Sequence, residues 1–287
     1  MKNIAIITGA SSGLGKEFAI QISQKYDFDE IWLIARRQDK LNEVADLINS
    51  QSNFSLARPI VMDIQGKDGV KEFKNFLTRE NDILEKIESG INIELLINNA
   101  GFGTYGPFEE TPIDRQMDMI DLNCTALTGI CGVALPFLRK GSHIINTASL
   151  AAFMPLGNFA VYAASKAYVL NFSIALAAEL KDKEIQVCAL CPGSVSTEFA
   201  NVASNGARKE VKGGYSPVKV VAHCLKKAYK NKKVALWHPK WKFNAFLSRI
   251  VSRYSVARIT YKYHKRPYKQ DKNKINEAEE VSLSQFN

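Results

Sequence analysis

The sequence predicts an α/β fold with a doubly wound, mainly parallel seven-stranded sheet and helices on both of its faces. Short apolar runs alternate along the chain with longer stretches of helical period, a pattern typical of parallel strands joined by crossover helices. Most of these runs are β-branched and apolar throughout, as expected for strands buried on both faces. A glycine-rich turn directly follows the first run and opens a helix.

Seven apolar runs bounded by turn residues are the predicted strands. In chain order they are Asn3–Ile7, Ile31–Ala35, Pro59–Met62, Ile93–Ile97, His143–Thr147, Ile185–Cys191 and Val234–Trp237. The segments between them are long enough for crossover helices. Two of those segments, Pro112–Leu138 and Val161–Leu180, are predicted long helices.

The 287 residues suit one large α/β domain or two small ones. Because the strand and helix alternation continues through the seventh strand, we expect a single domain over residues 1–240. Apolar residues then recur at helical spacing from Phe243 to Ala257, with arginines mainly off the stripe, which predicts a basic amphipathic helical extension over residues 241–268. The remainder, residues 269–287, is rich in Lys, Asn, Glu and Ser, which predicts a flexible tail.

The net charge of +9 is concentrated in the C-terminal third of the chain. Residues 205–287 hold 20 basic and 5 acidic side chains, whereas residues 1–204 hold 18 and 24. A solvated surface with a few contacts to a cofactor phosphate explains such a balance, and so does an anionic partner. Nucleic acid is not expected as that partner, since no recognition motif accompanies the charge.

Three features of the sequence bear on the cellular compartment. No apolar run approaches the length needed to cross a bilayer, and the N-terminus has no secretory signal pattern. The five cysteines are odd in number and have apolar neighbours, which favours reduced thiols. Cys188 and Cys191 have redox-pair spacing, but three residues apart on a strand they point to opposite faces. We therefore expect core thiols in a cytoplasmic protein, with peripheral contact to a membrane surface as an alternative for its basic extension.

The turn after the first strand is a candidate phosphate-binding site. Its candidate residues are Gly9, Ser11, Ser12, Gly13, Leu14 and Gly15. Glycines allow a tight turn and a close approach of the backbone to a pyrophosphate, and the helix N-terminus then offers free N–H groups to the phosphates. This predicts a dinucleotide site.

The end of the second strand indicates which dinucleotide binds. A carboxylate there favours the ribose hydroxyl of NAD, whereas arginine accommodates the additional phosphate of NADP. The strand ends in Ala35-Arg36-Arg37, without an acid at those positions. Because guanidinium groups hold phosphates by charge-assisted hydrogen bonds, we expect NADPH or NADP, with NAD the less favoured alternative.

Further motifs follow in a fixed order along the chain. They are Asp63, Asn98-Asn99-Ala100-Gly101, Asn123, Ser149, Tyr162-Ala163-Ala164-Ser165-Lys166 and Pro192-Gly193-Ser194-Val195-Ser196-Thr197. With the glycine turn they make the chain, from about Ile4 to Phe199, resemble the short-chain dehydrogenase/reductase family, in particular its NADP-preferring type with a basic amphipathic C-terminal extension. The resemblance implies a Rossmann-type domain.

The resemblance also implies roles for the matching residues. The catalytic set is Asn123, Ser149, Tyr162 and Lys166. The cofactor set beyond the turn and the arginines is Asp63 at the adenine, Asn99, Ala100 and Gly101 in the cleft, Tyr162, Lys166, and Pro192, Gly193, Val195 and Thr197 near the nicotinamide. Asn123 anchors a water that connects the lysine to solvent in the family. No metal ligand set is expected, and His143 lacks the spacing of a zinc ligand.

Tyr162 and Lys166 also form a chemical pair independently of the resemblance. Four residues apart on a helix, they share one face. A nearby ammonium favours the tyrosinate, so we expect the pKa of Tyr162 to lie below its ordinary value of about 10, nearer the operating pH of an acid/base catalyst. Ser149 is expected to hold the substrate oxygen, and the hydride comes from the nicotinamide.

Apolar residues cluster around the expected active-site rim. They are Phe102, Tyr105, Phe153, Met154, Phe159 and Phe199. If several of them face the nicotinamide, the pocket suits a fatty-acyl, steroid-like or other hydrophobic carbonyl. The glycine-containing segment from Ser194 to Ser216 matches the mobile lid of the family.

The basic extension allows three interpretations. Its apolar stripe packs on its own domain, forms a subunit contact, or lies on an anionic membrane surface. The family resemblance implies a homodimer or homotetramer through the helices Pro112–Leu138 and Val161–Leu180.

The leading functional hypothesis is an NADPH-dependent oxidoreductase that interconverts a carbonyl and an alcohol, reducing a hydrophobic ketone or aldehyde. Within enzymes, the alternative is a dehydrogenase that oxidises an alcohol. The alternative of a different class is a non-catalytic NADP-binding sensor or scaffold at a membrane surface. An intact set of Asn123, Ser149, Tyr162 and Lys166 favours the enzyme, because a sensor needs no proton-transfer residues.

Overall fold

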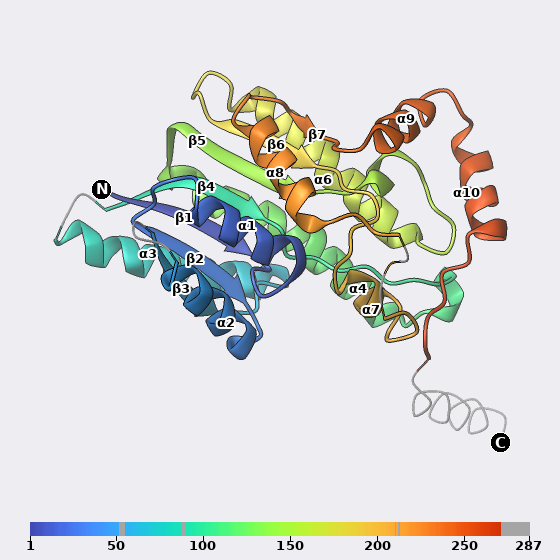
Figure 1. The fold of residues 1–287 in the computed structure, drawn as a ribbon, viewed down its shortest axis with the longest axis horizontal. Helices are drawn as coiled ribbons and strands as arrows, with labels where there is room; N and C mark the ends of the chain where they lie inside the picture. The colour runs from blue at the N-terminus through green and yellow to red at the C-terminus, as the bar shows by residue number, and fades with distance from the viewer. Residues whose placement is uncertain (52–54, 88–89, 210, 212, 271–287) are drawn as a thin grey trace.

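A seven-stranded parallel sheet forms the centre of the molecule, with helices covering both faces (Figure 1). The computed structural model describes residues 1–51, 55–87, 90–209, 211 and 213–270. The strand order is β3-β2-β1-β4-β5-β6-β7, and every pairing is parallel. The order changes direction between β1 and β4, and the crevice outside the carboxyl ends of the strands at such a point is where α/β sheets bind ligands.

All seven predicted strands are confirmed. They are β1 (Lys2–Thr8), β2 (Glu30–Ala35), β3 (Leu56–Val61), β4 (Ile91–Asn98), β5 (Leu138–Thr147), β6 (Gln186–Leu190) and β7 (Val234–Ala235). The largest difference is at β5, which begins five residues before His143. Its early residues Arg139–Gly141 are exposed, so they lack the apolar signal that marks the rest of the strand.

Two hydrophobic cores lie on opposite faces of the sheet. One contains Ile4 and Ile6 of β1, and the other contains the intervening Ala5 and Ile7, as expected for side chains that alternate along a strand. The first core is covered by α3 (Gly66–Glu85), α5 (Leu127–Ala134) and α6 (Ala160–Glu179). The second is covered by α1 (Gly13–Ser23), α2 (Gln38–Asn49) and α8 (Pro217–Ala228).

Cys188 and Cys191 lie in different cores, which confirms that strand alternation separates their side chains. Both thiols are free and buried.

The helix predicted over Pro112–Leu138 is confirmed as one helical stretch, Ile113–Phe137, whose winding changes along its length. It consists of α4 (Ile113–Ile120), a π-helical turn (Asp121–Ala126), α5 and a short 3₁₀ turn (Leu135–Phe137). A π turn widens the helix by one residue, and such turns occur frequently at functional sites. Here the turn contains Asn123. The second long helix, predicted over Val161–Leu180, is confirmed as α6.

Two helical stretches of the described chain, Ile113–Phe137 and Ala160–Glu179, are long and apolar enough to cross a membrane by composition. The expectation that no run has this length and apolarity is therefore corrected. Within the fold, 39% and 50% of their apolar windows are buried. Both stretches contribute residues to the first core, the one that contains Ile4 and Ile6, and this accounts for their apolar composition.

The predicted single amphipathic helix after residue 241 is divided in two. These are α9 (Pro239–Leu247) and α10 (Arg253–Tyr263), which project at one side of the domain (Figure 1). The predicted segment boundary at residue 240 falls inside α9. Of the predicted tail, residues 271–287 lie outside the described residues. The division of the chain into these three segments stays a prediction.

The apolar stripe of this segment faces away from the domain. Phe243, Phe246, Ile250 and Tyr254 are 62%, 59%, 69% and 74% exposed, whereas Trp241 is 4% exposed. Trp241 packs so closely on Gly193 that a Cβ at Gly193 would lie 2.4 Å from the indole Nε1. Since Trp241 occupies the inward side of α9, the stripe is left on the outward side. These four side chains of the stripe are therefore not packed on their own domain, whereas Val251 and Ala257 are partly buried.

Candidate active site

The glycine turn after β1 has the shape required for a bound phosphate. Gly9 and Gly13 have φ angles of +66° and +56°, a region that side chains disfavour. A Cβ at Gly15 would lie 2.1 Å from the carbonyl oxygen of Gly9, so only glycine allows α1 to begin this close to the strand. The resulting backbone cradle at a helix N-terminus fits the pyrophosphate of a nicotinamide dinucleotide.

Thr8 joins this turn to the end of β4. Its Oγ1 accepts hydrogen bonds from the backbone N–H groups of Asn99 and Ala100, at 3.0 and 3.1 Å. In the opposite direction, Nδ2 of the Asn99 side chain donates a hydrogen bond to the carbonyl oxygen of Gly9 at 3.2 Å. The sequence prediction included Asn99, Ala100 and Gly9 but missed Thr8 as a residue that holds the cleft together.

Basic side chains stand at the end of β2, as predicted. Arg37 donates hydrogen bonds to the hydroxyl groups of Ser11 and Ser12, at 3.2 and 2.8 Å, and pairs with Glu198 at 3.0 Å. Arg36 lies 3.6 Å from the carboxylate of Asp63. These groups surround the side of the cleft where the ribose of the adenosine is expected, and their donors fit a phosphate there.

One cavity of about 1730 Å³ connects the glycine turn with Ser149, Tyr162 and Lys166. Its volume exceeds the roughly 300–1,000 Å³ of a typical small-ligand site, so it has room for a dinucleotide and a substrate. All predicted site residues line it except Gly15 and Asn123. Gly15 instead provides the close helix–strand contact, and Asn123 lies behind the cavity wall.

Asn123 holds two parts of that wall together. Its Nδ2 donates to the carbonyl oxygen of Phe102 at 3.0 Å and to the hydroxyl of Ser165 at 3.1 Å. Its Oδ1 accepts from the backbone N–H of Phe102 at 3.1 Å. The π turn therefore ties the segment after β4 to α6, the helix that carries Tyr162 and Lys166.

Lys166 is buried and makes a hydrogen bond from Nζ to the carbonyl oxygen of Thr147 at 2.8 Å. Burial disfavours the ammonium and lowers the pKa of Lys166 to about 8. Nζ lies 5.8 Å from the centre of the Tyr162 ring, on the same face of α6, as the four-residue spacing predicted.

The pKa of Tyr162 is raised above its ordinary value, which contradicts the lowered value expected from the sequence. Burial of the phenol is the main cause, and a hydrogen bond with the Ser149 side chain opposes it. Desolvation acts on the whole side chain, whereas the charge of Lys166 was the only influence visible in the spacing. The phenol of this structure is therefore protonated at neutral pH.

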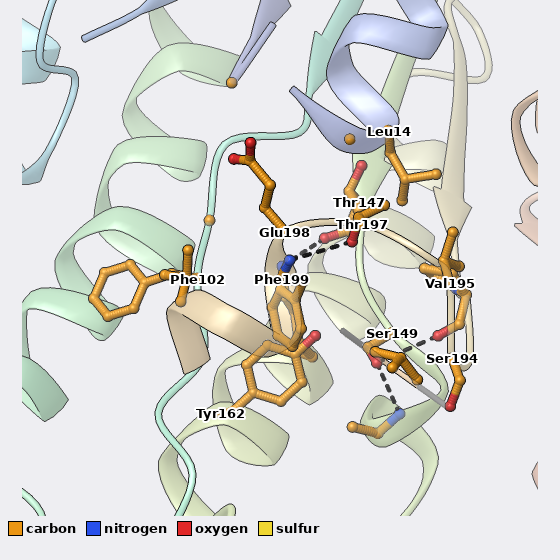
Figure 2. A pocket seen from close by; sticks show the side chains of 18 of the residues that line it. Leu14, Phe102, Thr147, Ser149, Tyr162, Ser194, Val195, Thr197, Glu198 and Phe199 are labelled. Atoms are coloured by element: carbon orange, nitrogen blue, oxygen red, sulfur yellow. Dashed lines mark hydrogen bonds between the residues drawn. The ribbon is translucent and has the colours of Figure 1, made fainter. Parts of the chain in front are cut away.

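Aromatic rings enclose Tyr162. Phe159 stacks on its ring with centres 4.1 Å apart, Phe199 lies at 5.4 Å, and Tyr105 meets Phe159 edge-on at 4.8 Å. Figure 2 shows the Tyr162 ring beside Phe199, with Ser149 across the pocket. Five of the six predicted rim residues line the cavity. The sixth, Phe153, packs against the first core.

The C-terminal segment contributes residues that sequence reasoning did not assign to the site. The residues from α10 and the loop after it that line the cavity are Thr260, Tyr263, His264, Lys265 and Arg266. Thr260 accepts a hydrogen bond at Oγ1 from the backbone N–H of Gly157 at 2.9 Å. Asn158 donates to the carbonyl oxygen of Tyr261 at 2.9 Å. No local pattern signals these contacts, because about a hundred residues separate the partners.

A sequence-family model described as short chain dehydrogenase matches residues 3–207. Among related proteins, a very-long-chain 3-oxoacyl-CoA reductase of Neurospora crassa is 33% identical over 202 residues, covering 69% of this chain and 58% of the relative. An uncharacterized oxidoreductase of Staphylococcus epidermidis is 29% identical over 213 residues, covering 73% and 85%. The chain thus spans little more than half the length of the fungal relative.

Solved structures share the fold at lower identity. A short-chain dehydrogenase from Sphingobium yanoikuyae in complex with NADPH has a TM-score of 0.71 at 24% identity, covering 87% of this chain and 94% of that one. A short chain dehydrogenase/reductase from Burkholderia phymatum in complex with NAD has a TM-score of 0.74 at 21% identity, covering 86% and 92%. With the family match across the glycine turn, the Tyr162 helix and the loop after β6, these findings show that the chain belongs to the short-chain dehydrogenase family of oxidoreductases.

Proposed function

We propose that this protein uses NADPH to reduce a hydrophobic ketone or aldehyde to an alcohol. The observation that carries the proposal is the meeting of Ser149, Tyr162 and Lys166 with the dinucleotide cradle and an aromatic wall in one cavity. When bound, the cofactor supplies the hydride, so the protein has to supply position and a proton.

The proposed proton donor is Tyr162. Its raised pKa keeps the phenol protonated at neutral pH, which suits donation to an oxygen that gains charge during reduction. Ser149, whose side chain lines the same cavity as Tyr162, would hold the same oxygen. Lys166 would supply positive charge beside the tyrosine as the phenol loses its proton. Asn123 would hold the segment after β4 and α6 in fixed positions relative to each other.

The same residues can run the reaction in reverse, with Tyr162 as base. A phenol with a raised pKa is a poor base near neutrality, which favours the reductase over the dehydrogenase. The aromatic wall of the pocket likewise favours an enzyme over an NADP sensor, because binding of the dinucleotide does not require it.

The direct test is loss of NADPH absorbance with ketones and aldehydes of increasing chain length, run beside NADH. Preference for long-chain members is expected from the aromatic wall. A 3-oxoacyl thioester belongs in the panel, because the relatives named very-long-chain 3-oxoacyl-CoA reductase carry that substrate in their names. Tight NADPH binding without turnover of any member would favour the sensor.

The rate of reduction is expected to fall as the pH rises above about 8. Lys166 carries its positive charge below its pKa of about 8 and loses it above that value, whereas Tyr162 keeps its proton. The Lys166→Arg variant retains the charge throughout, so its residual rate should be independent of pH in this range. A wild-type rate that stays constant to pH 9.5 would contradict the role given to Lys166.

We further propose that a cytoplasmic form of this enzyme contacts anionic membranes through α9 and α10. Residues 213–270 contain 15 Lys and Arg and no Asp or Glu, and the exposed side chains Phe243, Phe246, Ile250 and Tyr254 lie within this stretch. Apolar and aromatic side chains bordered by cations suit a membrane interface, where each basic group adds about 1 kcal/mol.

Co-sedimentation with vesicles tests this contact. Binding to phosphatidylserine-containing vesicles at low salt is expected, with a loss of about 10-fold or more in the variant carrying Phe243→Ser, Phe246→Ser and Ile250→Ser. Ile87→Ser, at a residue that is equally exposed but distant in the chain, should leave binding unchanged.

The same experiment separates the membrane from a subunit contact. If the triple variant lowers the mass measured by light scattering and vesicles bind neither protein, the stripe is a subunit contact. The proposed homodimer or homotetramer instead uses the exposed apolar residues Ile113, Met117, Tyr168 and Ile174 on α4 and α6, which the triple variant leaves intact.

A further inference from the structure

Arg266 places a guanidinium group one aromatic ring away from Tyr162. Its Cζ lies 5.1 Å from the centre of the Phe159 ring, and Phe159 stacks on Tyr162. Nη1 donates to the carbonyl oxygen of Gly157 at 3.1 Å. An arginine carries five N–H donors, so this bond uses a small part of its capacity.

No carboxylate of a described residue lies within ion-pair range of Arg266. The acidic side chains that line the cavity have other partners: Asp63 pairs with Arg36, Glu198 pairs with Arg37, and Asp118 accepts a hydrogen bond from Gln65. The charge of Arg266 is therefore not balanced from within the described part of the chain.

Arg208 adds a second positive charge on the same side of the cavity. Its Cζ lies 5.7 Å from the centre of the Tyr105 ring, which contacts Phe159, and Nη2 donates to the carbonyl oxygen of Lys265 at 3.1 Å. Burial lowers the pKa of Arg266, and the charge of Arg208 lowers it further. Arg266 is half-buried and Arg208 is exposed, so an anion that reaches Arg266 meets positive charge from both side chains on this side of the cavity.

We propose that Arg266 and Arg208 form a subsite for an anionic group of the substrate, so that the enzyme acts on carbonyl compounds that carry a carboxylate or a phosphate. The inference rests on the proposed reductase function and names its substrate class. The aromatic wall holds the carbon chain near Tyr162, and the two guanidinium groups take the anion by charge-assisted hydrogen bonds, which are often bidentate.

A structural role for Arg266 is the competing explanation. Its bond to Gly157 fastens the C-terminal segment beside the cavity, so a loss of activity alone would not identify a subsite. The two roles differ in their dependence on substrate charge, because a loosened segment affects neutral and anionic substrates alike.

The experiment compares an anionic substrate with a neutral ester of the same carbon chain. Values of kcat/KM are measured for 5-oxodecanoate and its methyl ester, with wild-type protein, Arg266→Gln, Arg208→Gln and Arg258→Gln. The last variant removes the same charge from an exposed position on α10 that does not line the cavity. Wild type should prefer the acid, and Arg266→Gln should reduce its kcat/KM by about 10-fold or more, with the ester changed less than about 2-fold.

A second pair of substrates identifies the source of the anion. A 3-oxoacyl-CoA is compared with the corresponding pantetheine thioester, which lacks the phosphates. A phosphate anion is indicated if Arg266→Gln and Arg208→Gln lower kcat/KM only for the CoA thioester. A carboxylate is indicated if they lower it only for the free acid.

Two results would overturn the subsite. One is a wild-type enzyme that reduces the methyl ester and the pantetheine thioester as efficiently as their charged partners, which would leave the reductase function intact. The other is an equal loss for charged and neutral substrates in Arg266→Gln, accompanied by a lowered melting temperature, with no charge-dependent loss in Arg208→Gln.

Failure of the reductase proposal is detected separately. If no substrate is turned over although NADPH binds, calorimetry with decanoate and decanol in the presence of NADPH still tests the subsite. Decanoate should then bind more tightly than decanol and lose about 10-fold in affinity in Arg266→Gln. Equal binding of the two ligands would reject the subsite.

Discussion

Replacing Tyr162 with phenylalanine is expected to lower kcat for carbonyl reduction by about 1,000-fold, within the range that a positioned proton donor contributes. The phenol is the only proton donor proposed at the reacting oxygen. The ring of the variant can keep its stacking on Phe159 and its contact with Phe199, so the pocket should retain its shape. NADPH absorbance measures the rate, and NADPH fluorescence titration should give a Kd within about 2-fold of wild type.

Tyr105→Phe is the matched control for this variant. Tyr105 is also buried, lines the same cavity and packs against the same Phe159 ring, but it is not proposed to donate a proton. Removing its hydroxyl should change kcat by less than about 5-fold, because the loss is then one of local packing. Retention of a tenth or more of the wild-type rate in Tyr162→Phe would contradict the proposed role.

Replacing Arg36 and Arg37 together with glutamine is expected to lower kcat/KM for NADPH by about 100-fold and to leave the value for NADH nearly unchanged. The additional phosphate of NADPH is the group that the arginines are proposed to bind, and hydrogen bonds to charged groups contribute about 1.5–3 kcal/mol each. Steady-state kinetics with both cofactors measure the ratio. The pair between Arg37 and Glu198 is half-exposed and weak, so the phosphate can replace it.

Arg79→Gln serves as the control for charge, because Arg79 is exposed and lies outside the cavity. It should leave both cofactors unaffected. An equal loss for NADH and NADPH in the double variant would show that the arginines shape the turn through Ser11 and Ser12 and do not select the cofactor.

Much of the fold and most of the candidate site follow from local patterns. The apolar runs that predict β1, β2 and β4 are short and buried on both faces, so each strand is marked by its own residues. The glycine turn needs its backbone angles at Gly9 and Gly13, which few other residues adopt. Because the carboxyl ends of parallel strands meet at one edge, motifs that follow β1, β4, β5 and β6 lie together without further information.

Other properties depend on groups that are distant in sequence. The direction of the Tyr162 pKa shift follows from burial of the phenol, whose ring contacts Phe159 and Phe199, and the spacing to Lys166 indicated the opposite direction. The π turn at Asn123 changes the winding within a segment whose periodicity is that of one regular helix.

The sequence by itself determined the parallel sheet, the phosphate-binding turn and the order of the motif residues, because each depends on neighbours in the chain. Only the tertiary structure decided which side of α9 is buried and that Arg266 reaches the ring beside Tyr162. Helical spacing records that a stripe is apolar, but a larger side chain, Trp241, takes the inward position and leaves Phe243 and Phe246 exposed. The contacts of α10 with Gly157 and Asn158 then bring Arg266 to the cavity, across a separation that no local pattern encodes.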